Sequence, residues 1–234
     1  MHPFPKSLGS LVITSALAVG TAAAQLETKL HAGYSSEYLW RGLDLGHDLV
    51  EAGLDVSTTY HDIGLSAGAW YGCFETGGQH HDELDLYGEV ARDFGWIKGS
   101  IGYIAYLYPD ANSNAAQEVY FGVARDLGFA TASLKYFWSV AGANNDGYAE
   151  LGLSKSFELN PDLNLTVDSN LGYLVEQGQA TAWTTRLTLD WGFAPHAKLS
   201  PFIALSLALS DDANTAYLHS NNEFAAGTLL SFSF

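Results

Sequence analysis

Apolar and polar residues alternate with a period of two along most of this chain. In residues 163–175, for example, Leu163, Leu165 and Val167 share one face, whereas Asn164 lies on the other. Such alternation is typical of strands with one face in an apolar environment and one in a polar environment. The pattern predicts twelve strands, at 28–40, 49–60, 63–74, 83–92, 96–108, 117–126, 129–140, 148–158, 163–175, 181–191, 199–210 and 223–234. Alternation is poorest in 96–108 and 199–210.

Short and long connections take turns between the predicted strands. The short ones are turns such as 61–62 and 127–128, and 192–198 is a longer member of this set. The longer polar connections are expected at 41–48, 75–82, 109–116, 141–147, 176–180 and 211–222. Outer-membrane barrels have this asymmetry, an even number of strands and short periplasmic turns. The sequence therefore predicts an all-β fold, a transmembrane antiparallel up-and-down barrel of about 12 strands with both ends in the periplasm.

Aromatic residues near the strand ends favour this barrel over a secreted β-sandwich or jelly roll, which the alternation also allows. Membrane barrels carry aromatic girdles at both interfaces. The chain ends on Phe234, with Leu230 and Phe232 on the same face, which resembles the signal that the barrel-assembly machinery recognises. Three aromatic pairs are predicted to form the girdles: Tyr38 and Trp40, Tyr136 and Trp138, and Trp183 and Trp191.

Residues 1–24 have the features of a secretory signal peptide. Lys6 gives a positive start, an apolar stretch follows, and Ala22–Ala24 form a small-residue cleavage site. The apolar run is short for a transmembrane anchor, which is the alternative interpretation. We therefore assign 25–234 to the barrel and expect export through the periplasm to the cell outer membrane, where lipid surrounds the protein.

Composition narrows the possible functions. Charged residues make up only 15% of the chain, against roughly 25% in soluble domains, which suits a protein whose outer surface does not face water. The formal net charge of −16 argues against nucleic acid as a partner, because such binding needs a cationic face. A single cysteine, Cys73, excludes an intramolecular disulfide and any multi-cysteine metal site.

The segment 36–42, SEYLWRG, resembles the S-x-Y-x-[FW]-R-G signature near the mature N-terminus of the TorF family of porins. Two further regions are similar to that family. One is 102–109, GYIAYLYP, followed by 117–123, and the other is 148–159, followed by 163–173. The matches occur in order along most of the mature chain. The resemblance implies an outer-membrane barrel that works as a porin.

If the polar faces line the lumen, acids outnumber bases there. The acids are Glu37, Glu51, Asp55, Asp85, Glu89, Glu118, Asp126, Glu150, Asp168 and Asp190, and the bases are Lys29, Arg41, Lys98, Lys135 and Arg186. All of these except Asp126 and Lys29 form the predicted pore-lining set. Acidic linings raise the local concentration of cations and disfavour anions. Because twelve strands make a barrel of intermediate width, we expect a narrow pore for passive, cation-preferring diffusion of ions or small solutes.

The alternative is a non-conducting barrel with a structural or surface-binding role. Its lumen would be plugged by side chains that pair with one another. Arg41 with Glu37, and Arg186 with Asp190, are the pairs that a shared face would allow.

Other chemistry has little support in the sequence. Outer-membrane lipid hydrolases carry a His and a Ser two residues apart on one strand, whereas His219 and Ser220 are adjacent here. We therefore expect no enzymatic activity and no cofactor, with an enzyme based on scattered carboxylates as the third hypothesis. The segments 80–83 and 47–48 offer imidazole and carboxylate groups that suit zinc or nickel, but solvated outer loops are the favoured interpretation and no metal site is predicted.

Overall fold

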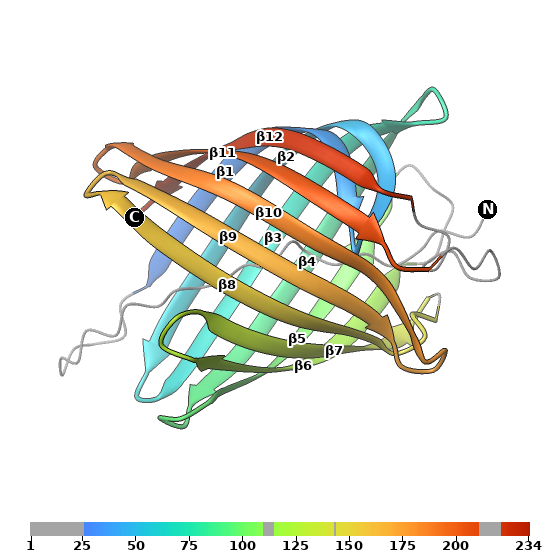
Figure 1. The fold of residues 1–234 in the computed structure, drawn as a ribbon. Helices are drawn as coiled ribbons and strands as arrows, with labels where there is room; N and C mark the ends of the chain where they lie inside the picture. The colour runs from blue at the N-terminus through green and yellow to red at the C-terminus, as the bar shows by residue number, and fades with distance from the viewer. Residues whose placement is uncertain (1–25, 110–114, 143, 211–220) are drawn as a thin grey trace.

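The chain forms one antiparallel sheet that closes into a barrel, as the computed structural model shows (Figure 1). The structure describes residues 26–109, 115–142, 144–210 and 221–234. Each strand pairs with its neighbours in sequence, and β12 pairs with β1 to close the barrel. The strands are β1 (Glu27–Trp40), β2 (Leu43–Tyr60), β3 (Ile63–Thr76), β4 (Gln79–Asp93), β5 (Lys98–Leu107), β6 (Ala116–Asp126), β7 (Thr131–Ala141), β8 (Tyr148–Asn160), β9 (Leu163–Leu174), β10 (Gln179–Ala194), β11 (Ala197–Ala208) and β12 (Glu223–Ser233).

All twelve predicted strands are confirmed, including the two with poor alternation. In β5 the outward Ile101 is exposed while the inward Ile104 is buried, so both faces of the strand are apolar. In β11 the outward Ile203 and the inward Phe202 repeat this arrangement. A period of two is weak in these strands because the lumen beside them is itself partly apolar.

Large apolar side chains cover the outside of the barrel. Soluble monomers rarely expose a continuous apolar surface of this kind, so the belt indicates contact with lipid. Trp183 and Trp191 are exposed on it, 52% and 49% respectively, in agreement with the predicted girdle. Belt residues on strands around the barrel include Leu54, Leu65, Leu86, Phe121, Leu134, Leu151, Leu187, Leu205, Phe224 and Leu230.

Two connections that were predicted to be long are two-residue turns, so these two predictions are wrong. The β1–β2 turn contains only Arg41 and Gly42, with φ of 50° and 82°, and the β3–β4 turn contains only Gly77 and Gly78, with φ of 60° and 76°. Positive φ at both central residues is the requirement of the type I′ hairpin turn. Residues 43–48, 75–76 and 79–82 therefore continue the strands, because polar side chains do not prevent backbone pairing outside the lipid belt.

The barrel has two distinct ends. The terminal end carries the N-terminus of β1, the C-terminus of β12 and the short turns, including a tight turn at 195–196 where a longer connection was expected. The far end carries the β1–β2 and β3–β4 turns and the remaining connections. The predicted signal peptide, 1–24, and most of the expected loops at 109–116 and 211–222 lie outside the described residues. Among the residues that are described, no helix is long and apolar enough to cross a membrane.

Candidate functional site in the barrel lumen

Most of the predicted pore-lining residues lie on the inner face of their strands. Two cross-strand pairs illustrate the register, since Glu150 lies opposite Lys135 and Asp168 lies opposite Arg186. The inward positions alternate with exposed apolar residues of the belt, so parity assigns them to the lumen. The inward members of the predicted set are Glu51, Asp55, Asp85, Glu89, Lys98, Glu118, Lys135, Glu150, Asp168, Arg186 and Asp190.

The end of β1 departs from this parity. The register between β1 and β2 shifts between Glu37 and Leu39, where β1 is irregular. Such an irregularity moves the following side chains to the other face. Tyr38 and Trp40 are therefore buried in the lumen, with 7% and 1% exposed, and their prediction as girdle residues is wrong. Glu37 lies at the start of the shift, opposite His47 of β2.

Buried apolar residues fill the lumen toward the far end. We call this group the far-end cluster. Its rings pack closely: the centroids of Tyr38 and Phe74 are 5.0 Å apart, and those of Tyr120 and Phe137 are 5.4 Å apart. Because its members come from β1–β3 and β5–β9, the cluster reaches across the lumen from wall to wall. They are Tyr38, Trp40, Leu43, Leu49, Trp70, Phe74, Ile104, Tyr106, Ala116, Tyr120, Phe137, Tyr148 and Leu174.

A fully buried ion pair lies within the far-end cluster. Arg41 Nη1 donates to Glu118 Oε1 at 3.1 Å, and Nη2 donates to Oε2 at 2.7 Å. Both side chains have 0% exposure. Tyr106 donates its hydroxyl to Glu118 Oε2 at 2.9 Å, and Asn145 Nδ2 donates to Oε1 at 2.6 Å. The four donated bonds compensate the carboxylate for lost water, which is what makes a buried charge tolerable.

The Arg41 guanidinium is also enclosed by aromatic rings. Its Cζ lies 4.1 Å from the ring centroid of Tyr148, 4.5 Å from that of Trp40 and 4.6 Å from that of Phe137. Such cation–π contacts are strongest when the cation is desolvated, as it is here. Arg41 is thus held by charge, hydrogen bonds and ring faces together.

The β1–β2 turn carries Arg41 into the lumen. A Cβ on Gly42 would overlap Ala182 of β10, and Ser206 Oγ of β11 donates to the Gly42 carbonyl at 3.4 Å. The turn therefore folds inward, and Arg41 crosses to Glu118 on β6, about half-way around the barrel. The predicted pair of Arg41 with Glu37 is wrong, because parity alone gives no sign of a turn that bends into the lumen.

Nearer the middle of the barrel, tyrosines bridge strands to reach carboxylates. Tyr87 of β4 donates to Asp55 Oδ1 of β2 at 2.5 Å, and its ring lies where a Cβ on Gly68 of β3 would be. Tyr120 of β6 donates to Glu89 Oε2 of β4 at 2.9 Å across Gly102 of β5 in the same way. A glycine in the middle strand lets each ring cross it.

The terminal end of the lumen is polar and hollow. Asp190 accepts from Ser200 Oγ at 2.6 Å and lies 3.0 Å from Lys198 Nζ. Arg186 packs over Phe202, with its Cζ 3.5 Å from the ring centroid, so the expected pair of Arg186 with Asp190 is replaced by these contacts. A cavity of about 860 Å³ opens here, lined by side chains that include Ser156, Asp162, Asn164, Thr166, Asp190 and Lys198.

Sequence reasoning missed several of these residues. Glu83 is 0% exposed and accepts a hydrogen bond from Tyr38 at 3.1 Å, and its polar-face position in β4 was a usable signal. Tyr106 had no such signal, because it belongs to a poorly alternating strand, and Asn145 lies in a connection. Lys198 also lies in the lumen at the terminal end, beside Asp190. It adds a base that the prediction left out, so acids outnumber bases in the lumen by one fewer on its account.

Residues 20–228 match the model of a family described as "Bacterial protein of unknown function (Gcw_chp)". The chain belongs to the Gcw_chp family. No curated protein matches this Gcw_chp chain. The resemblance to the TorF family stays a prediction.

Solved structures share the fold of this Gcw_chp protein at low sequence identity. The KdgM porin is 10% identical with a TM-score of 0.55, over 88% of this chain and 99% of that one. An outer membrane channel from Pseudomonas putida F1 is 13% identical with a TM-score of 0.54, over 94% and 97%. Outer membrane phospholipase A from Escherichia coli is 13% identical with a TM-score of 0.52, over 88% and 92%. The shared feature is the outer-membrane barrel fold, which hosts both channels and an enzyme.

Proposed function

We propose that this protein is a porin-like channel of the outer membrane through which small cations diffuse passively. The proposal depends on a charge asymmetry of the inner wall. The wall formed by β2, β3 and β4 faces the lumen with carboxylates, and the sequence has no lysine or arginine between Leu43 and Ala91. The inward carboxylates of this acidic wall are Glu51, Asp55, Glu83, Asp85 and Glu89.

The bases of the lumen lie on other strands. Lys98 of β5 and Lys135 of β7 face inward, and Lys135 Nζ lies 5.5 Å from the ring centroid of Tyr120. The acidic wall carries carboxylates without bases, whereas bases and acids are mixed on the other strands, so the charge across the lumen is uneven. The overall excess of acids favours cations over anions. Ions or small solutes are the expected cargo, because the far-end cluster leaves little room for larger ones.

The proposed membrane placement has the terminal end in the periplasm and the far end outside. Thr28 and Phe234 exchange backbone hydrogen bonds of 2.8 and 3.1 Å, so the last residue helps to close β12 on β1. The Phe234 side chain is 69% exposed on the outer surface. This position is accessible to the barrel-assembly machinery, which we propose recognises it after export directed by residues 1–24.

The far-end cluster favours a second candidate, a barrel that is closed by a permanent plug and has a structural or surface-binding role. The buried pair of Arg41 with Glu118 spans the lumen, and aromatic residues surround it. In the channel proposal the same cluster is the constriction, and its side chains move to admit an ion.

Single-channel recording of the refolded protein in a planar bilayer under a salt gradient tests both candidates. The channel proposal predicts discrete steps with a reversal potential on the cation side. The acidic-wall variant Asp55→Asn/Glu89→Gln is expected to move the reversal potential toward zero, whereas the outward variant Arg92→Gln is the control and leaves it unchanged.

Two results contradict the proposal. Anion-selective steps would show that the acidic wall does not govern permeation. A folded barrel without conductance would favour the plugged alternative, especially if the double variant Arg41→Ala/Glu118→Ala then conducts. Folding is checked in each case by circular dichroism and by the heat-dependent gel migration of the barrel.

A further inference from the structure

A row of histidines and carboxylates runs across neighbouring strands at the far end of the barrel. His47 of β2 lies directly opposite Glu75 of β3, and Glu75 lies directly opposite His80 of β4. Residues opposite each other in a ladder point to the same face and have Cβ atoms roughly 5 Å apart. The parity of β3, in which Trp70 and Phe74 are buried inside, places this row on the outer face.

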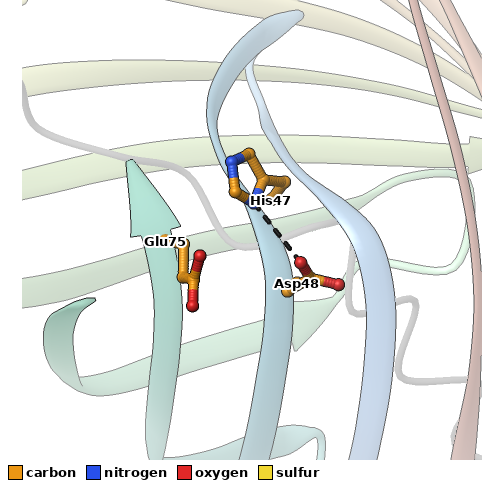
Figure 2. A group of neighbouring side chains, drawn as sticks. All are labelled: His47, Asp48 and Glu75. Atoms are coloured by element: carbon orange, nitrogen blue, oxygen red, sulfur yellow. Dashed lines mark ion pairs between the residues drawn. The ribbon is translucent and has the colours of Figure 1, made fainter. Parts of the chain in front are cut away.

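A β-bulge brings a fourth group to the row. The register between β2 and β3 shifts between His47 and Val50, and Asp48 has a φ of 55°. A bulge re-aims side chains, and here it leaves His47 and Asp48, which are adjacent in sequence, on the same side of the strand. Figure 2 shows His47 and Asp48 joined as an ion pair, with Glu75 on the neighbouring strand; His47 Nδ1 lies 3.4 Å from Asp48 Oδ2.

These distances match the dimensions of a metal site. One ligand atom each from His47, Asp48 and Glu75 lie within 4.8 Å of one another. Tetrahedral Zn²⁺ with bonds of about 2.1 Å holds its ligand atoms roughly 3.4 Å apart, so exposed side chains need only small rotations to close on an ion. His80 Nε2 lies 3.3 Å from Glu75 Oε1, at the same spacing.

A hydrogen bond from a neighbouring strand orients the Asp48 carboxylate. Tyr34 of β1 donates its hydroxyl to Asp48 Oδ1 at 2.6 Å, which leaves Oδ2 directed at His47. A ligand carboxylate held from behind by a hydrogen bond is the usual second layer of a metal centre. We propose that His47, Asp48 and Glu75 bind one divalent transition-metal ion on the outer rim of the barrel, with His80 as the fourth ligand.

The ligand types decide the class of ion. Two imidazoles and two carboxylates suit Zn²⁺, Ni²⁺ or Co²⁺, whereas Ca²⁺ and Mg²⁺ prefer oxygen ligands alone. A bound ion ties β2 to β3 and β4 where the bulge interrupts the ladder, and it therefore stabilises this rim.

Calorimetric titration of the refolded barrel with Zn²⁺ at pH 7.5 in a non-chelating buffer tests the site. We expect one ion per chain. His47→Asn and Glu75→Gln are each expected to weaken binding at least tenfold, and His80→Asn to weaken it less, because the His80 side chain is 75% exposed. The matched control is His61→Asn, an exposed histidine of the β2–β3 turn at the terminal end, beside Asp62.

Co²⁺ absorption and thermal unfolding provide independent readouts. Co²⁺ is expected to give the intense visible bands of four-coordinate geometry in the wild type and in His61→Asn, but not in His47→Asn. Saturating Zn²⁺ is expected to raise the unfolding temperature of the same two proteins. The proposal is overturned if the folded wild type shows no saturable Zn²⁺ binding, or if His61→Asn weakens binding as much as His47→Asn does.

Discussion

The two ends of the lumen are built from the same alternating strands, yet their contents are opposite. The far end is packed with aromatic rings around the buried pair of Arg41 with Glu118. The terminal end holds a polar cavity of about 860 Å³ in which the Asp190 carboxylate is partly exposed beside Lys198. A side chain that points into the barrel is therefore not necessarily exposed to water.

The difference comes from how the charged side chains at each end are compensated for the loss of water. At the far end Glu118 exchanges water for four hydrogen bonds from Arg41, Tyr106 and Asn145. At the terminal end water remains available, so Asp190 has only Ser200 and Lys198 as partners. Desolvated pairs respond strongly to the loss of one member, whereas solvated pairs respond weakly. This contrast ranks the expected effects of mutation along the barrel.

The largest effect is expected for Arg41→Ala. This change leaves the Glu118 carboxylate buried without its cation, which costs on the order of 3–5 kcal/mol in free energy of unfolding. Urea unfolding of the refolded barrel, followed by tryptophan fluorescence, measures the loss. The equivalent change at the terminal end, Lys198→Ala, is expected to cost less than about 1 kcal/mol, because that pair is partly solvated.

A double variant sharpens this prediction. Arg41→Met/Glu118→Leu removes both charges and keeps most of the volume, but Tyr106 and Asn145 lose their acceptor, so it is expected to recover part of the stability lost in Arg41→Ala. Equal losses in Arg41→Ala and Lys198→Ala would show that the far-end pair is not energetically special and would remove the distinction between the two ends.

The sequence predicted the architecture well because strand parity is a local property. The apolar belt, the strand count and the outward aromatic residues such as Trp183 all follow from a period of two. The filling of the far end was not predictable in this way. It depends on the irregularity after Glu37, which reverses the direction of Tyr38, and on a turn that bends inward.

The pairing of the charged residues in the lumen could not be predicted from the sequence either. Arg41 in the β1–β2 turn and Glu118 on β6 are 77 residues apart, and β6 pairs with neither β1 nor β2, so no local pattern joins them. The bridge from Tyr87 to Asp55 depends on a glycine in the strand between them, and glycines are common throughout the chain. Sequence thus identified which residues face inward, while their pairing required the closed barrel.

An intermediate effect is expected where a ring crosses a glycine. Gly102→Ala places a Cβ where the Tyr120 ring lies, and the overpacking is expected to cost about 1–3 kcal/mol in free energy of unfolding. Gly64→Ala is the matched control, because a Cβ there meets only the carbonyl of Ala91, at 3.9 Å. Urea unfolding compares the two, and a similar stability for both variants would show that the ring moves aside at little cost.

The smallest effect is expected from a single hydroxyl at the boundary between the two ends. Tyr87→Phe keeps the ring over Gly68 but removes the bond to Asp55, for an expected loss of about 1 kcal/mol in free energy of unfolding. The loss is small because Asp55 keeps His31, whose Nδ1 lies 3.5 Å from Oδ2. Tyr103→Phe, on the outer face of β5, is the control in the same urea assay. A loss for Tyr87→Phe as large as that for Arg41→Ala would mean that the dry environment of the far end extends to Asp55, and the boundary would then lie nearer the terminal end.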